Sequence, residues 1–243
     1  MNFVVIMKRE FRGYFETPIA YVFIAIFLVL SGVFTFYLGN FYERQQADLI
    51  PFFSFHPWLY LFLIPAISMR LWSEERKSGT LELLMTLPLS RLSIVFGKFL
   101  AAWVFSGVAL ALTFPIWITV NYLGDPDNGI IVASYIGSWM MAGSFLAIGS
   151  CMSAITKSQV IAFVLCGFVS LLFVMAGFPL VLDLVKGWVP LSLVDIVASL
   201  SFLTHFNAVS RGVLSLQDFL YFISVIAFWL GATSIVLDMK KGG

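Results

Sequence analysis

Charged side chains are scarce in this sequence. Asp, Glu, Lys and Arg make up 11% of the 243 residues, whereas a soluble domain carries about 25%. Hydrophobic residues make up 60%, and Phe alone occurs 26 times. The core of a soluble protein cannot hold so many apolar side chains, so the excess must face lipid. The net charge of +1 gives no overall basic field, which argues against nucleic acid as a partner.

Cysteine and histidine are also rare, at two residues each. Cys151 and Cys166 lie inside long apolar runs, so we interpret both as packing residues rather than as an extracellular disulfide. His56 and His205 fall on the same predicted side of the membrane, which leaves a two-histidine metal site open as an alternative. Because no carboxylate or thiol spacing supports such a site, we predict that the chain holds no metal ion.

A phosphate-binding loop is absent from the sequence. The pattern G-x-x-x-x-G-K-[S/T] surrounds phosphates with backbone amides. Gly97–Lys98 comes nearest to it, but Leu92 stands in place of the first glycine and Phe99 in place of the Ser or Thr. The segments between apolar runs are too short for an ATPase domain. We therefore predict no cofactor in this chain, and an ATP-driven process would need ATP and Mg²⁺ on a separate polypeptide.

Long apolar runs are abundant, and a membrane helix needs about 20 apolar residues to cross the hydrocarbon core. The second run is interrupted by His56, Pro57 and Pro65. The fourth run carries a stripe of small residues that we expect to serve internal helix packing, Gly143, Ala147 and Cys151. The sequence predicts an all-α integral membrane protein, a single domain over residues 1–243, with six spans at 18–38, 52–69, 92–120, 130–154, 159–182 and 219–237.

The distribution of Lys and Arg predicts the orientation. Eleven of these residues lie in 1–17, 70–98, 155–158 and 238–243, and three lie in 39–51, 124–129 and 183–217. The positive-inside rule makes the first side cytoplasmic, together with both termini. Lys98 lies at the rim of the third predicted span, where its stem is expected to snorkel toward water.

Residues 1–17 precede the first span and alternate apolar and basic side chains with a helical period. The stretch "MNFVVIMKREFRGYFE" places Lys8, Arg9 and Arg12 on a face that adjoins an apolar one. This pattern predicts an amphipathic interface helix in the headgroup layer. Two interpretations remain open: the helix is a membrane-edge anchor, or it is a lever that joins the first span to a cytoplasmic partner.

Residues 70–91 form a charged loop with a short predicted helix. Gly79 breaks the chain, Thr80 can cap the helix that follows, and Ser90 can cap the next one. We expect no core within the chain that is large enough to bury the apolar face of the short helix, so a groove on another protein is expected to bury it. The alternative is an ordinary polar loop. The side chains of that helix that we expect to matter are Leu81, Glu82, Leu84 and Met85.

The order of residues in this loop carries a family resemblance. "EERKSGTLELLMTLPLSRLSIVFGK", residues 74–98, resembles the loop between the second and third spans of ABC-2 type transporter permeases. "SFLTHFNAVSRGVLSLQDFLYFISVIAFWL", residues 201–230, resembles the segment before the last span in the branch that includes gliding-motility permeases. The N-terminal "KREFRGYFETPIAYV" is also similar to that branch.

The resemblance implies a permease subunit in the cytoplasmic (inner) membrane of a bacterium. Such a chain is a non-catalytic exporter subunit, coupled to a cytoplasmic ABC ATPase that binds ATP and Mg²⁺, and it pairs with a second permease subunit as a homodimer or heterodimer. The residues that match the family's coupling loop are Glu74, Glu75, Thr80, Leu81 and Glu82. Glu74 and Glu75 would meet bases on the ATPase or lock the end of the second span. Leu81, Leu84 and Met85 would enter its cleft.

Residues 183–217 form a long, half-apolar connector on the outer side. The pattern indicates short amphipathic helices, and the resemblance implies that they re-enter the outer leaflet as a gate. An interfacial loop is the alternative. His205 and Arg211 are the residues that we expect to act there.

Other classes of membrane protein fit the sequence less well. A secondary transporter or channel usually carries ionisable relays within its spans, and an intramembrane enzyme needs paired catalytic groups at membrane depth. The interiors of the predicted spans have neither. The remaining alternative is an ATPase-driven mechanical or motility-associated component that passes no substrate.

Overall fold

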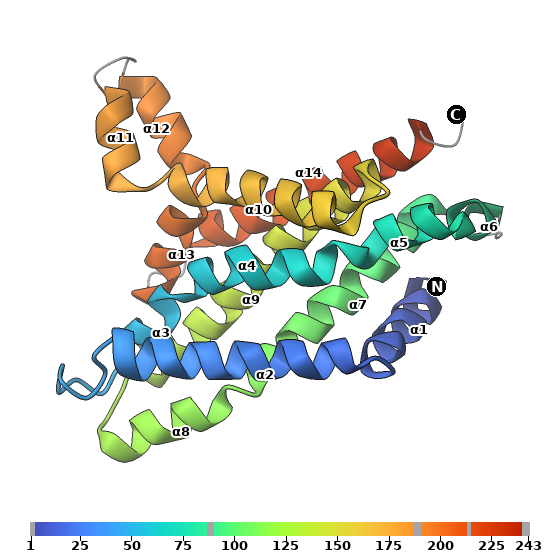
Figure 1. Ribbon diagram of the computed structural model, residues 1–243. Helices are drawn as coiled ribbons and strands as arrows, with labels where there is room; N and C mark the ends of the chain where they lie inside the picture. Colours follow the sequence, from blue (N-terminus) through green and yellow to red (C-terminus); the bar gives the residue numbers. More distant parts are fainter. Residues whose placement is uncertain (1–2, 87–89, 187–190, 213–214, 240–243) are drawn as a thin grey trace.

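The fold is taken from a computed structural model of the chain, which describes residues 3–86, 90–186, 191–212 and 215–239. Every regular element in these ranges is helical (Figure 1). In chain order the elements are α1 (Phe3–Phe15), α2 (Pro18–Val33), the π-helical turn η1 (Phe34–Leu38), α3 (Ile50–Ser54), α4 (His56–Ser68), α5 (Arg70–Ser78), α6 (Thr80–Thr86), α7 (Arg91–Ala111), α8 (Phe114–Leu123), α9 (Asn128–Ile155), α10 (Gln159–Met175), α11 (Pro179–Lys186), α12 (Leu191–Ser199), α13 (Phe202–Ser210) and α14 (Leu216–Met239).

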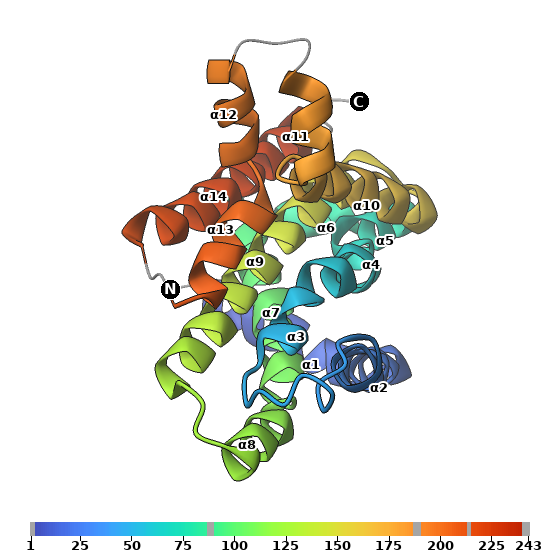
Figure 2. The same cartoon turned by 90° about the vertical axis from the view of Figure 1, so that its left-hand side faces the viewer.

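Helix α9 forms the middle of the bundle and contacts α4, α5, α7, α10, α13 and α14 (Figure 2). The most apolar part of α9 is 72% buried, against 28% in Pro18–Leu38 (α2 with η1) and in α14, so α9 is the helix that the others surround. Its small residues allow this close packing: a Cβ atom at Gly149 would lie 2.0 Å from Ser68 Oγ. The expectation that Gly143, Ala147 and Cys151 serve internal packing is confirmed, because all three are buried.

Two tryptophans tie α7 to α9. The rings of Trp103 and Trp139 stack with centroids 4.4 Å apart. Trp103 Nε1 donates to the carbonyl of Trp139 at 2.8 Å, and Trp139 Nε1 donates to the carbonyl of Trp103 at 3.0 Å. Both indole N–H groups are therefore satisfied inside an apolar bundle, where an unpaired donor is costly.

The long helices agree only partly with the predicted spans. Within the described residues, four helical stretches are long and apolar enough to cross a membrane: Pro18–Leu38, Arg91–Leu123, Asn128–Ile155 and Leu216–Met239. The predicted second span is divided between α3 and α4, and α4 has only 13 residues. The fifth is shorter than predicted, because α10 ends at Met175 and Pro179 begins α11 in a new direction. The count of six spans stays a prediction.

The third predicted span is a bent pair of helices rather than a single one. Helix α7 ends at Ala111, and α8 begins at Phe114 with Pro115 in its first turn. The hydroxyl of Thr113 at this bend donates to the carbonyl of Leu110 at 2.6 Å and lies 2.9 Å from Tyr135 Oη. Since proline cannot donate to the preceding turn, the helix changes direction here.

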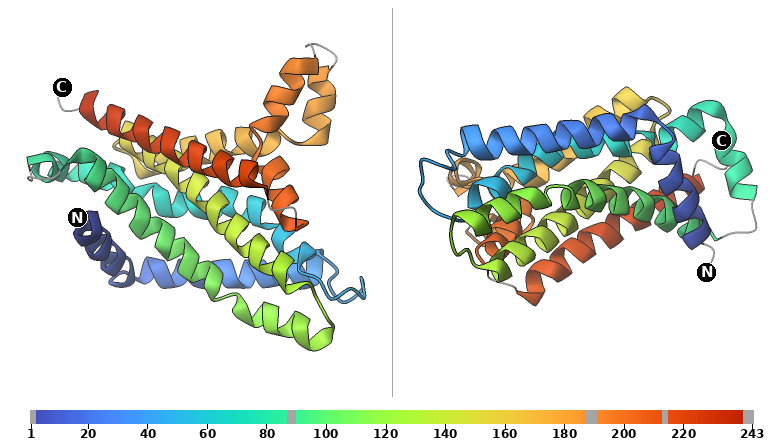
Figure 3. Two further views of the ribbon diagram at one scale, coloured as in Figure 1. Left: turned by 180° about the vertical axis from the view of Figure 1, so that it is seen from behind. Right: turned by 90° about the horizontal axis from the view of Figure 1, so that it is seen from below.

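Different segments of the chain gather at the two ends of the bundle. Helices α1, α5 and α6 and the last turn of α14 lie at one end, which we call the charged end (Figures 1 and 3). Residues 39–49, α3 and α13 lie at the other end. The grouping of segments on two sides agrees with the sequence prediction. Helices α11 and α12 form a hairpin that projects sideways from the bundle and does not insert between the long helices (Figure 3).

Candidate functional site

The helix predicted near the N-terminus is present as α1, and it packs against α7; its place in the headgroup layer stays a prediction. Ile6 is buried in this contact. Gly97 on α7 makes the approach possible, because a Cβ atom there would lie 2.9 Å from the carbonyl oxygen of Phe3. The three predicted basic residues, Lys8, Arg9 and Arg12, are exposed. The apolar face of α1 therefore has a partner within the chain itself.

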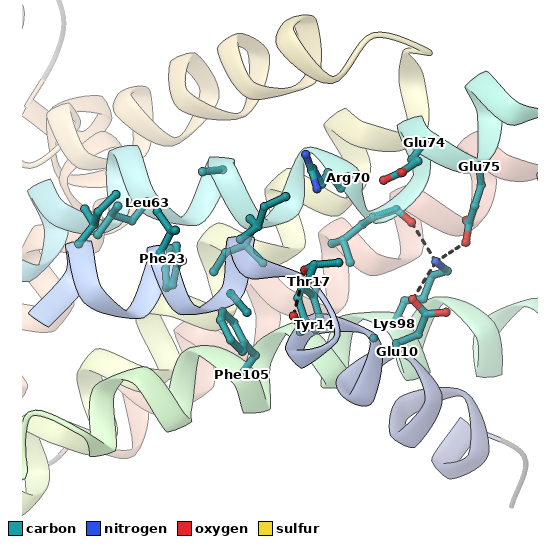
Figure 4. A pocket seen from close by; sticks show the side chains of 18 residues that line it. Glu10, Tyr14, Thr17, Phe23, Leu63, Arg70, Glu74, Glu75, Lys98 and Phe105 are labelled. Atoms are coloured by element: carbon teal, nitrogen blue, oxygen red, sulfur yellow. Dashed lines mark hydrogen bonds and ion pairs between the residues drawn. The ribbon is translucent and has the colours of Figure 1, made fainter.

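Lys98 lies at the centre of a buried ion cluster in the charged end (Figure 4). Its Nζ lies 2.5 Å from Glu75 Oε1, 3.3 Å from Glu10 Oε2 and 3.1 Å from the carbonyl oxygen of Leu71. The same Nζ is 5.3 Å from the ring centroid of Trp72. The expectation that Lys98 snorkels to water is wrong, since this residue is 3% exposed and its charge is neutralised by α5 and α1.

The cluster shifts the pKa values of Glu75 and Glu10 in opposite directions. Burial raises the pKa of Glu75, and the attraction of Lys98 offsets only part of that effect. Burial also acts to raise the pKa of Glu10, but Lys98 and Arg9 together outweigh it, so the pKa of Glu10 lies below its ordinary value. Glu75 is thus the first member of the cluster to take up a proton on acidification.

The helix expected in the charged loop is present as α6. Gly79 ends α5 with a left-handed φ of 74°, a conformation that favours glycine and turns the chain into α6. Thr80 is the first residue of α6 rather than the cap before it, and its hydroxyl lies 2.8 Å from Ser78 Oγ. Ser90 caps α7 as predicted, because its hydroxyl accepts from the Ser93 amide at 3.3 Å.

The residues predicted to couple the chain to an ATPase differ in the exposure of their side chains. Glu74, Thr80 and Glu82 are exposed, and Leu81 is half-buried. Leu84 is 8% exposed and packs in the chain's own apolar core, and its expected role in a partner's cleft stays a prediction. The side chain of Met85 lies outside the described residues. Glu75 forms an ion pair with Lys98, which is consistent with the expected alternative that Glu75 locks the end of the second span.

At the opposite end, His205 is held by a network of hydrogen bonds. Its Nδ1 lies 2.6 Å from Asp218 Oδ1, and its Nε2 lies 2.9 Å from the carbonyl oxygen of Ser199. The ring stacks on Tyr221 at 3.9 Å between centroids. Ser215 donates to Asp218 Oδ2 at 2.6 Å. Sequence reasoning overlooked Asp218, although it lies inside the segment that carried the family resemblance.

Arg211 does not join His205. It is exposed in the turn after α13 and lines a separate pocket of about 220 Å³ together with Asp48 and Asp127. His56 is buried in α4, and its Nδ1 lies 2.7 Å from Ser138 Oγ. In the part of the chain that the structure describes, no group of three or more His, Cys, Asp or Glu side chains is placed to hold a metal ion.

An all-helical bundle with long apolar helices and one charged end defines a multi-pass membrane protein. A family model described as "ABC-2 family transporter protein" matches residues 4–240, so the chain belongs to the ABC-2 transporter family. It is therefore a membrane subunit of a transporter, a type of chain that is not itself catalytic. No curated protein sequence matches the chain significantly.

Proposed function

We propose that this protein is the permease subunit of an ABC-2 type exporter, driven by ATP that a separate cytoplasmic ATPase hydrolyses. The family match and the lack of a phosphate-binding loop in the sequence support this function. The observation that carries the proposal is the position of α6, which Gly79 turns out from the charged end at the tip of α5 (Figure 1). A short helix presented in this way is suited to enter a groove on a partner.

The ion cluster supports a path for force from α6 into the bundle. Helix α5 joins α6 to α4, and Glu75 on α5 is bound to Lys98 on α7. Glu10 brings α1 into the same cluster. A crevice of about 290 Å³ between Arg9 and α6 is lined in part by Thr80 and Leu84. A displacement of α6 would therefore be transmitted to α1, α4 and α7 together, which supports the lever interpretation of the interface helix.

The remaining parts of the proposal follow from the family and from the charge distribution. The chain crosses the inner membrane of a bacterium six times with both termini in the cytoplasm, and a second permease subunit, identical or different, completes the transport path. Apolar side chains on the outside of α10 and α14 provide surface for lipid and for that subunit; examples are Val164, Phe168, Ile223 and Phe228. The charged end then faces the cytoplasm, and His205 and Arg211 lie in an outer gate region.

One observation favours the second candidate function, a motility-associated mechanical component. The α11–α12 hairpin projects sideways from the outer end (Figure 3), so it supplies a lever on which an envelope partner can be moved. Transport remains the better-supported function, because the family match concerns transporters.

The proposal is tested by gentle purification from the native membrane and identification of the chains that come with the protein. The informative variant carries Thr80→Arg and Glu82→Arg, since both side chains are exposed on α6. The matched control carries Glu43→Arg and Gln46→Arg, which place the same side chains on the exposed loop at the opposite end. We expect an ATP-binding ATPase with wild type and with the control, and its loss with the α6 variant.

Two outcomes would contradict the proposal. If several mild conditions yield no ATPase with wild type, the energy-coupled function falls. If the ATPase stays with the α6 variant, α6 is not the contact and the coupling site lies elsewhere.

A further inference from the structure

A pocket of about 410 Å³ lies in the charged end between the α1–α2 elbow, α4–α5 and α7 (Figure 4). The extended backbone of Thr17 separates α1 from α2 and forms the elbow. Phe105 on α7 closes the floor, because its ring contacts Tyr14 and Phe23 with centroids 5.0 and 5.5 Å away. The pocket is therefore formed by packed aromatic side chains and has a size typical of ligand sites.

The pocket is amphipathic along its length. Toward the middle of the bundle its walls are apolar, with Phe23 on α2 facing Leu63 on α4 (Figure 4). Toward the charged end the lining residues include Arg70, Glu74 and Glu75. The α2 side chains at the rim are themselves exposed on the outer surface of the bundle, with Val22 55% exposed. A molecule dissolved in the bilayer therefore has access to the pocket, with its polar part at the charged end.

The polar groups in the pocket are only partly used by the chain. Lys98 is occupied, since its three N–H donors meet Glu75, Glu10 and the carbonyl of Leu71. Arg70 Nε and Glu75 Oε2 are both buried without a hydrogen-bond partner. Glu74, exposed at the mouth, adds a second carboxylate. The pocket thus offers a guanidinium for an anion and carboxylates for a cation.

We propose that this pocket binds one aminophospholipid from the adjoining leaflet. The phosphate lies against the guanidinium of Arg70, the primary ammonium lies against Glu74 and the free oxygen of Glu75, and the acyl chains begin between α2 and α4. Planar guanidinium groups suit phosphate oxygens, and a primary ammonium supplies the donors that carboxylates need.

The charges that line the pocket favour an aminophospholipid over lipids with acidic or choline headgroups. The pocket is lined by three acidic residues, Glu10, Glu74 and Glu75, and by two basic ones, Arg70 and Lys98, so an acidic headgroup without an amine meets excess negative charge. A choline headgroup has no N–H donor for the carboxylates. The lipid ammonium is thus a ligand for Glu74 at the membrane surface. This proposal goes beyond the proposed function because lipid binding requires neither an ATPase nor transport.

The test measures lipid binding to the purified, delipidated full chain by native mass spectrometry. Phosphatidylethanolamine, phosphatidylglycerol and phosphatidylcholine are added separately, and phosphoethanolamine serves as a headgroup without acyl chains. We expect phosphatidylethanolamine to bind about tenfold more tightly than the other two lipids, the effect of one charge-assisted hydrogen bond. Phosphoethanolamine should show no binding at the same concentration.

Three variants locate the site. Arg70→Gln should weaken phosphatidylethanolamine binding about tenfold, and Glu74→Gln should remove the preference over phosphatidylglycerol. Leu63→Trp should block binding by filling the apolar half without any change of charge. Lys77→Gln is the matched control, because it removes a charge from an exposed position of α5 outside the pocket and should leave binding unchanged. Thermal unfolding of each variant verifies that it is folded.

Several results would overturn the assignment. They are equal binding of all three lipids, binding of phosphoethanolamine at the concentration used for the lipids, equal losses of phosphatidylethanolamine binding in Arg70→Gln and Lys77→Gln, and no lipid bound to the wild-type protein. Since no ATPase takes part in the measurement, failure here leaves the proposed transport function untouched, and failure of the co-purification experiment leaves the lipid site untouched.

Discussion

Replacing Lys98 by methionine should strongly destabilise the protein. Methionine keeps most of the apolar stem of the side chain but leaves Glu75 without a cation and Glu10 with only its ion pair to Arg9. Removing one partner of a buried ion pair costs about 3–5 kcal/mol. The two carboxylates are 20% and 23% exposed, so some water reaches them and the lower end of that range, about 3 kcal/mol, applies. For a chain of this length the melting temperature should fall by about 6–12 °C.

The assay is thermal unfolding in detergent, followed by tryptophan fluorescence. Arg91→Met is the matched control, because Arg91 forms an ion pair with Asp238 in which both side chains are more than 40% exposed. Surface pairs contribute about 0–1 kcal/mol, so this control should hardly move the transition. Adding Glu75→Gln to Lys98→Met should restore part of the loss. Equal shifts in the two methionine variants, or no recovery in the double variant, would refute the assignment of stability to the cluster.

Two further predictions follow from the charged end. As the pH falls toward 4.5, the ordinary value for Glu, Glu75 should take up a proton before Glu10, since burial raises the pKa of Glu75 and Lys98 holds that of Glu10 down. Because its folded-state pKa is raised, the stability that Glu75 contributes is present at low pH and lost as the pH rises through that pKa. The fluorescence of Trp72, which lies beside Lys98, should report this step. Gly79→Ala should cost about 1 kcal/mol, because φ is 74° there, and should weaken association with the proposed ATPase partner.

Each of these predictions has its own control. Glu75→Gln should abolish the fluorescence step, and a step that persists in this variant belongs to another group. Gly32→Ala is the counterpart for Gly79→Ala, because a Cβ atom at either glycine has nothing within 4 Å and only Gly79 has a positive φ. Equal effects of the two alanine substitutions would show that the left-handed turn does not position α6.

The parts of the candidate site that local sequence controls were predicted well. Gly79 and Ser90 act within a few residues of their own position, so the turn before α6 and the cap of α7 are readable from the sequence. The ion cluster is different, because Glu10 is 88 positions from Lys98 along the chain and nothing local links them. The core position of Leu84 was not predicted for the same reason, because the sequence of an apolar helix face is the same whether another protein or the same chain buries it.

By itself the sequence determined the class of protein: apolar runs separated by short charged segments require helices in lipid, since every backbone group must be satisfied within its own segment. It also determined which segments gather at the charged end. Only the tertiary structure decided that α9 occupies the centre, that Lys98 binds α1 and α5, and that a pocket with Arg70 and Glu74 opens at the α1–α2 elbow. These features depend on side chains far apart in the sequence, and the packing of whole helices against one another brings them together.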